Sequence, residues 1–173
     1  YFVIIIGIDP GIKGAIAFYR PQDGKLKIYD MPKLEKENGR WEVDSMGVTK
    51  LVSRYVKGLA SSIAVIEDVS AMTYVDAKGN KRGQGAAASF AFGKGVGQLL
   101  GVLAAHWIRV IPVKPSVWKS LMNVSSDKST SIALARERFP KYCNYFAKKS
   151  SDGRAEAALL CLFAVERFGG NWP

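Results

Sequence analysis

Four acidic residues stand where a carboxylate can take part in chemistry. Asp9 and Glu67 each come directly after a short run of apolar, largely β-branched residues. Such runs are typical of buried strands, which rarely carry a carboxylate inside, so an acid at the end of one can project into a cleft. Asp152 and Glu156 are four residues apart at the start of a predicted helix, and this spacing places them on one face. These four acids are the candidate catalytic residues.

Positive charge is concentrated in the second part of the chain. The net charge is +10 and the isoelectric point is near 9.7. Residues 1–70 carry ten Lys/Arg and nine Asp/Glu, whereas residues 71–173 carry fifteen Lys/Arg and only six Asp/Glu. A basic half favours a polyanionic partner, nucleic acid before an anionic membrane. A solvated basic surface with no specific partner is the alternative interpretation.

Convergence of the four carboxylates would require a cation, because clustered negative charges repel each other. Hard oxygen ligands suit Mg²⁺ or Mn²⁺, and two such ions can activate a water and stabilise the leaving oxygen of a phosphodiester. Each acid also has a structural interpretation: Asp9 can shape its turn, Asp152 can cap its helix, and Glu67 and Glu156 can form ion pairs. Together with the basic half, the acids favour a site with two metal ions.

Composition excludes several other classes. The chain has 173 residues, 48% of them hydrophobic, which predicts one domain over 1–173 with a sizeable core. Cys143 and Cys161 have no partners at metal spacing, and Cys161 is expected in the core. His106 is the one histidine of the sequence, which disfavours histidine-based catalysis. The sequence contains no known phosphate-binding or hydrolase motif, so no organic cofactor is predicted. The uncharged stretch 95–108 is too short for a membrane span, so no membrane association is predicted.

The predicted elements must bring the acids together. Strands are predicted at 2–9, 14–19, 25–31, 63–66 and 108–113, and helices at 46–56, 86–106, 115–122, 126–139 and 153–168, with a long basic loop over 72–88. A meander followed by alternating helices and strands predicts an α/β fold, with a mixed five-stranded sheet and helices on both faces. In such sheets, functional sites gather at strand ends and helix starts.

The acidic motifs resemble a known family. The segments that carry the resemblance are Gly7-Ile8-Asp9-Pro10-Gly11, Ile66-Glu67 and Asp152-Gly153-Arg154-Ala155-Glu156-Ala157. In this order they are similar to the RuvC-type Holliday-junction resolvases, phage and chloroplast branch, of the ribonuclease H-like superfamily. The resemblance implies a ribonuclease H-like fold, a homodimer, and nicking of symmetry-related strands at four-way junction DNA. It also implies that Asp9, Glu67, Asp152 and Glu156 bind Mg²⁺ or Mn²⁺, two ions per site.

One departure concerns the last two acids. The bacterial pattern spaces them three apart with Asp second, whereas here the spacing is four and the second is Glu156. Which of Asp152 and Glu156 is the direct metal ligand is therefore left open.

The resemblance also predicts residues that contact DNA. Lys119 and Lys128 lie in segments similar to those that carry the family's active-site lysines, and Lys128 is included among the catalytic residues. Met72 and Tyr74, which follow Glu67, are candidates to insert between or stack on bases. The remaining predicted phosphate contacts are Lys78, Lys81, Arg82, Lys94, Lys148 and Lys149.

Three further expectations complete the prediction. The helix at 86–106 is expected to form the dimer interface through Phe90, Phe92, Val96, Leu99, Leu100 and Leu103, with packing inside the monomer as the alternative. The protein is expected inside the cell, with DNA. Alternative functions are another ribonuclease H-like nuclease, acting on RNA–DNA hybrids or as a transposase-like domain, and a catalytically silent nucleic-acid-binding relative.

Overall fold

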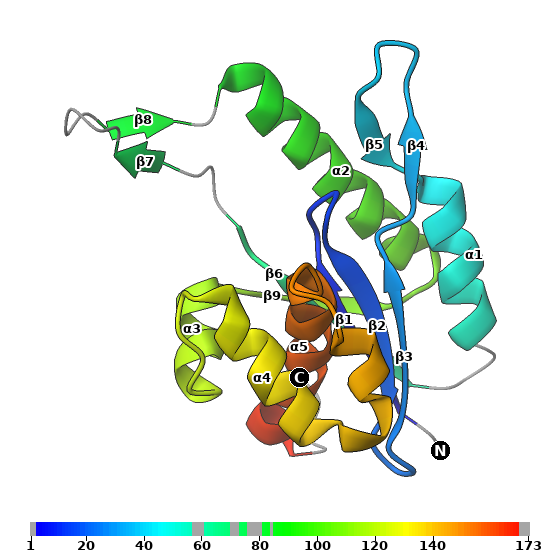
Figure 1. Cartoon of the computed structure of the whole chain (residues 1–173). Helices are drawn as coiled ribbons and strands as arrows, with labels where there is room; N and C mark the ends of the chain where they lie inside the picture. The colour runs from blue at the N-terminus through cyan, green and yellow to red at the C-terminus, as the bar shows by residue number, and fades with distance from the viewer. Residues whose placement is uncertain (1–2, 57–60, 70–72, 76–80, 84, 170–173) are drawn as a thin grey trace.

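A five-stranded mixed sheet forms the centre of the molecule. The computed structural model describes residues 3–56, 61–69, 73–75, 81–83 and 85–169. In spatial order the strands are β3 (Lys25–Asp30), β2 (Ala15–Arg20), β1 (Ile4–Asp9), β6 (Ser62–Glu67) and β9 (Arg109–Val113). The first three form an antiparallel meander, whereas β6 pairs in parallel with both β1 and β9. The predicted mixed sheet is confirmed (Figure 1).

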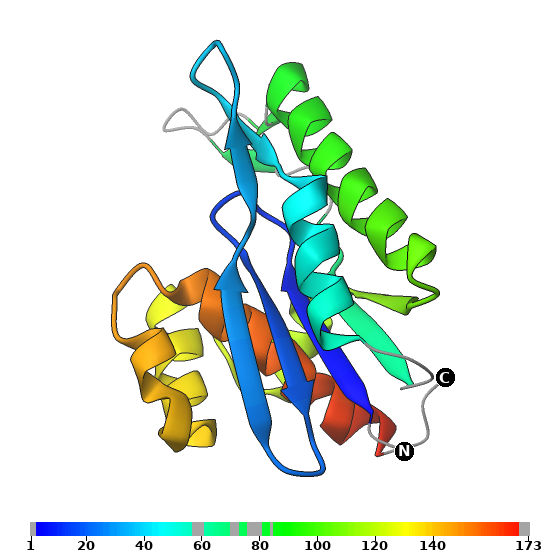
Figure 2. The ribbon, with the colours of Figure 1, turned by 90° about the vertical axis from the view of Figure 1, so that its right-hand side faces the viewer.

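Two separate apolar cores cover the two faces of the sheet. Alternate residues of β1 divide between them: Ile5 belongs to one core, and Ile6 and Ile8 to the other. This is the period of two expected for a strand buried on both faces. Figure 2 shows α1 (Ser45–Tyr55) and α2 (Ala86–Ala105) on one face and α5 (Asp152–Phe168) on the other. The core around α5 also includes residues of α3 (Pro115–Leu121), α4 (Lys128–Arg138) and the 3₁₀ helix η1 (Pro140–Phe146).

Helix α5 packs unusually close to the sheet because small residues face each other. A Cβ added at Gly7 would lie 2.0 Å from the carbonyl oxygen of Ala157, so only glycine fits at this position of β1. Cys161 is fully buried, as predicted, and lies against the same glycine. This close packing fixes the start of α5 relative to the end of β1.

Two short hairpins were not predicted. β4 (Lys33–Glu35) pairs with β5 (Trp41–Val43), and β7 (Thr73–Val75) pairs with β8 (Lys81–Gly83). The second pair lies within the segment 72–88, so the prediction of a loop there was wrong in part. Three-residue strands show too little alternation to be recognised by their pattern. Both hairpins project from the end of the sheet at which the turn after β1 lies (Figure 1).

Helix α2 is apolar over its whole length and only partly covered. Among the described residues, it is the one helix long and apolar enough to cross a membrane by length and composition alone. The helix spans Ala86–Ala105 and carries one charged residue, so the predicted helix at 86–106 is confirmed, whereas the absence of membrane association stays a prediction. Leu99 and Leu103 face the core, whereas Phe90 is 76% exposed.

Candidate active site

The turn between β1 and β2 holds Asp9 at the end of the sheet. Asp9 is the last residue of β1 and pairs with Ala15 of β2. Its Oδ1 accepts a hydrogen bond from the Gly11 backbone N–H at 3.3 Å, and the Gly14 N–H closes the turn on the Gly11 carbonyl at 2.8 Å. The turn-shaping role that the sequence offered for Asp9 is therefore present. The hydrogen bond from Gly11 uses Oδ1 of Asp9 and leaves Oδ2 for other contacts.

Glu67 lies beside Asp9 because their strands run parallel. Ile8 of β1 is in register with Ile66 of β6, so both acids follow at the same edge of the sheet. The side chain of Glu67 is buried, and its Oε1 accepts a hydrogen bond from the indole Nε1–H of Trp118 at 2.9 Å. Trp118 is fully buried in α3. Sequence reasoning missed its role, although a buried indole N–H needs an acceptor and an acid at a strand end supplies one.

Gly153 lets the first turn of α5 approach Asp9. A Cβ at this position would lie 2.8 Å from the carbonyl oxygen of Lys13 and 3.0 Å from Oδ2 of Asp9. Asp152 and Glu156 lie in the first turns of the same helix. The structure thus brings the four predicted acids to one region, from β1, β6 and α5.

Burial and mutual repulsion act on the two strand acids. Desolvation raises the pKa of Asp9 to about 7, and the charges of Glu156, Glu67 and Asp152 add to the rise, against the opposing hydrogen bond from Gly11. Desolvation likewise raises the pKa of Glu67, with Glu156 adding to the rise and Trp118 opposing it. The four carboxylates therefore form one electrostatically coupled cluster, as perturbed acids at functional sites often do.

Two lysines neutralise the helical acids. Lys119 Nζ donates to Oε1 of Glu156 at 2.8 Å, and the buried Ser131 hydroxyl donates to the same oxygen at 3.3 Å. Lys128 forms an ion pair with Asp152, and this hydrogen bond raises the pKa of the lysine. The two lysines predicted from the family's active-site segments, Lys119 and Lys128, thus lie at the site. Ser131 was missed, because a serine in the middle of a helix gives no signal by itself.

The donor chemistry of the cluster fits a hard divalent cation. Its oxygen ligands are those that Mg²⁺ and Mn²⁺ prefer, and burial together with the charges of the neighbouring carboxylates raises the pKa of Asp9 to about 7. As the side chains stand, no three acidic, histidine or cysteine residues within the described part of the chain are grouped closely enough to hold an ion. Binding would therefore require Asp152 and Glu156 to turn from their lysines towards Asp9.

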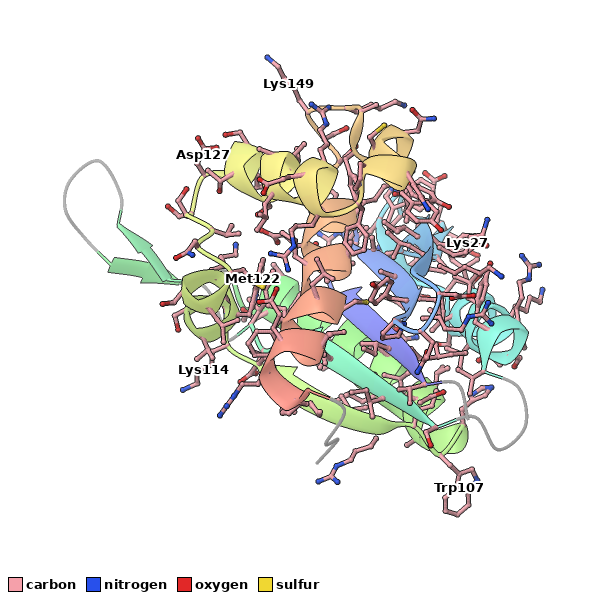
Figure 3. The ribbon with its side chains drawn as sticks, turned by 90° about the horizontal axis from the view of Figure 1, so that it is seen from below. Lys27, Trp107, Lys114, Met122, Asp127 and Lys149 are labelled. Atoms are coloured by element: carbon pink, nitrogen blue, oxygen red, sulfur yellow. The ribbon has the colours of Figure 1, made fainter. Side chains whose placement is uncertain are left out.

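The other predicted DNA contacts within the described residues belong to α2, to the turn before α5 and to the β7–β8 pair. Lys94 of α2 is paired with Glu42 of β5 at 2.9 Å. Lys148 and Lys149 lie in the exposed turn before α5, and Figure 3 shows Lys149 pointing into solvent. Tyr74 is a β7 residue, and Lys81 and Arg82 belong to β8. Lys78 and Met72 lie outside the described residues.

Comparisons with known proteins identify the fold. No protein-family model matches the chain, and no curated protein matches it in sequence. Among solved structures, T. thermophilus RuvC in complex with Holliday junction substrate covers 95% of this chain and 96% of its own, with a TM-score of 0.56 and 14% identity. The Thermus thermophilus RuvC structure covers 96% of both chains, with a TM-score of 0.53 and 15% identity. The α/β fold of this chain is therefore the ribonuclease H-like fold of RuvC.

Proposed function

We propose that the protein is a structure-selective endonuclease that resolves four-way DNA junctions by metal-dependent symmetric nicking. The observation that carries the proposal is the coupled cluster of Asp9, Glu67, Asp152 and Glu156 at one end of a RuvC-like sheet. One of the RuvC structures with this fold was solved with Holliday junction substrate. A nuclease acting on such DNA is expected inside the cell, where the DNA is.

Each residue of the cluster has a distinct part in the proposed reaction. Asp9 and Glu67, fixed by the sheet and by Trp118, would hold the metal ions, with Asp152 and Glu156 completing the ligand set. Bound Mg²⁺ or Mn²⁺, two ions per site, would supply an activated water and stabilise the leaving oxygen. Lys119 and Lys128, which pair with Glu156 and Asp152, would donate to the phosphate oxygens of the strand being cut.

Recognition of the junction would depend on phosphate contacts more than on base edges. The exposed Lys148 and Lys149, and the basic residues of β8, lie on segments outside the central sheet. Contacts of this kind position DNA without reading its sequence, and they make affinity fall steeply with salt. The shape of the four-way junction, rather than its base sequence, would therefore distinguish it from other DNA.

Symmetric nicking requires two active sites, and the exposed face of α2 is the proposed dimer interface. Phe90 and Leu100 are 76% and 39% exposed on this helix. Among the described residues, no atom outside the backbone of α2 itself lies within 4 Å of a Cβ added at Gly93, Gly97 or Gly101, so a second helix could approach closely. Leu99 and Leu103 were expected at the interface as well, but they are buried in the monomer core.

The test of the dimer interface is Phe90→Ser, with Trp107→Ser as a matched control. Trp107 is 96% exposed in the turn after α2. Light scattering after size-exclusion should show a dimer for the wild type and the control, and a monomer for Phe90→Ser. A monomeric wild type at micromolar concentration would contradict the interface.

The test of the activity compares substrates and one variant. A labelled four-way junction, a linear duplex and an RNA–DNA hybrid are incubated with Mg²⁺ and with wild type or Asp9→Asn. Paired nicks in the junction alone, lost in Asp9→Asn while junction binding survives, are expected. Cleavage of the hybrid without the junction would indicate another ribonuclease H-like nuclease, and binding without any cleavage would indicate a silent relative.

A further inference from the structure

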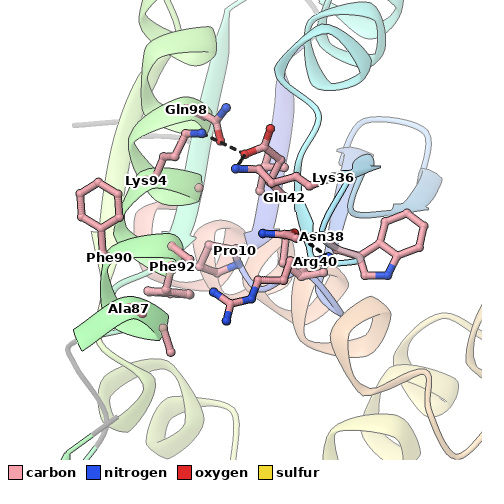
Figure 4. A pocket seen from close by; sticks show the side chains of 16 residues that line it. Pro10, Lys36, Asn38, Arg40, Glu42, Ala87, Phe90, Phe92, Lys94 and Gln98 are labelled. Carbon is pink, nitrogen blue, oxygen red and sulfur yellow. Dashed lines mark hydrogen bonds and ion pairs between the residues drawn. The ribbon is translucent and has the colours of Figure 1, made fainter. Parts of the chain in front are cut away.

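A groove separate from the carboxylate cluster lies between the β4–β5 hairpin and the first half of α2. It encloses about 560 Å³, a size typical of ligand sites. Its floor includes Pro10, the residue directly after Asp9, so the groove opens next to the candidate active site. Figure 4 shows Phe92 and Arg40 reaching from the two walls towards Pro10. Further lining residues are Ile12, Trp41, Val43 and Gln98.

The two walls are tied together by charge and by close packing. Glu42 of β5 accepts from Lys94 of α2 at 2.9 Å and pairs with Lys36 of the hairpin at 2.8 Å. A Cβ added at Gly95 would lie 3.0 Å from Val43, so glycine allows β5 to pack tightly on α2. The ion pairs and the close packing therefore fix the two walls of the groove relative to each other.

The chemistry of the lining points to a nucleotide. Trp41 is 46% exposed, and Lys33 Nζ lies 4.9 Å from the centroid of its ring, so one face of the ring carries a cation. Phe92 is a second aromatic residue of the lining, and aromatic rings of this kind are surfaces on which bases stack. Both lysines of the groove share Glu42, whereas the guanidinium of Arg40 has no carboxylate partner within the described ranges. An aromatic surface beside a guanidinium that has no carboxylate partner among the described residues matches a base with its phosphate.

We propose that this groove binds one unpaired nucleotide of the DNA strand that enters the active site. The base lies against Phe92 and Trp41, and Arg40 holds its phosphate. This proposal rests on the proposed function, because only a junction-cutting enzyme would bring the strand to be cut into the neighbouring active site. Its consequence is that DNA with unpaired bases at the crossover is preferred over perfectly paired DNA.

The first test uses single-stranded DNA without cleavage. A short fluorescein-labelled oligothymidine is titrated, in EDTA, with wild type, Phe92→Leu, Arg40→Ala and the control Lys27→Ala. Lys27 is an exposed lysine of β3, visible in Figure 3. Loss of a stacking or phosphate contact should weaken binding about ten-fold in the first two variants, and the control should stay within about two-fold. Absence of binding by wild type, or equal weakening in all three variants, would overturn the proposal.

The second test locates the base. Junctions with 5-iododeoxyuridine at single positions are irradiated with the metal-free protein, and cross-linked peptides are identified by mass spectrometry. A cross-link from a crossover position to Phe92 or Trp41 is expected. Cross-links to these residues only from paired positions within the arms, or none at all from a bound junction, would refute the groove as a nucleotide site.

The two proposals fail in different ways. If the protein cuts no junction but its single-strand binding depends on Phe92 and Arg40, the resolvase function is wrong and the groove remains a nucleotide site. If it cuts junctions while Phe92→Leu and Arg40→Ala bind single strands as wild type does, the groove is wrong and the resolvase remains. Because Arg40 is exposed, Arg40→Ala keeps the test valid even if Phe92→Leu impairs folding.

Discussion

The substitution Asp9→Asn should stabilise the metal-free protein at alkaline pH. In the folded chain the pKa of Asp9 is raised from 3.8 to about 7, first by burial and then by the neighbouring carboxylates. The folded state therefore binds this proton more tightly than the unfolded state does. The contribution of protonated Asp9 to the free energy of unfolding is therefore fully present below about pH 4, and it is lost as the pH rises through about 7.

The size of the effect follows from the pKa difference. Each unit corresponds to about 1.4 kcal/mol, so the ionised Asp9 costs the fold about 4 kcal/mol at pH 8. Asparagine is neutral and can still accept the Gly11 N–H, so Asp9→Asn should recover most of this free energy at pH 8 and almost none at pH 4. The control is Asp68→Asn, because Asp68 is exposed and should change stability by less than about 0.5 kcal/mol.

The assay is urea unfolding in EDTA at several pH values between 4 and 8.5, with the midpoint and slope compared between proteins. The expected gain for Asp9→Asn grows with pH while the slope is unchanged. Added Mg²⁺ should then stabilise wild type more than the variant, because binding to the folded state alone adds stability. A variant that is equal to or less stable than wild type at pH 8, or a difference that does not vary with pH, would refute the coupled cluster.

Three further predictions concern the supports of the site. Trp118→Phe removes the donor to Glu67 and should cost about 1–3 kcal/mol, measured by urea unfolding, together with a loss of junction cleavage. Gly153→Ala forces α5 away from the β1–β2 turn, so it should lower both the unfolding midpoint and the cleavage rate; an unchanged rate would mean that this contact does not position the acids. Arg154→Ala breaks an exposed ion pair with Asp30 and should change the free energy of unfolding by less than about 1 kcal/mol, with cleavage retained.

Local patterns were sufficient to predict the central architecture. The inner strands β1, β2 and β6 are largely buried, and their apolar runs identify them without tertiary information. The same runs end in Asp9 and Glu67, so the meeting of these acids follows from the parallel pairing of β1 with β6. The amphipathic and apolar helices were likewise predicted, because helix burial repeats along the chain with a regular period.

The short hairpins and the 3₁₀ helix needed the structure. β4 and β5 have three residues each, and their pairing is set by the turn at Gly39 and by packing on α2 rather than by a repeated pattern. The groove between this hairpin and α2 therefore had no signature in the sequence. Lys94 pairs with Glu42 in the fold, a contact that no local pattern indicated, and its contact with DNA stays a prediction.

The amino-acid sequence alone determined which side chains are acidic, where apolar strands end, and how charge divides along the chain. The tertiary structure decided how those side chains are paired. The indole that holds Glu67 lies 51 residues away in the chain, and the lysine that neutralises Glu156 lies 37 residues away. The spacing of apolar residues along the sequence indicates which face of each element is buried. A contact between two elements depends instead on how closely they pack, as Gly153 of α5 does against Asp9 and Lys13, and no local pattern of residues encodes that distance.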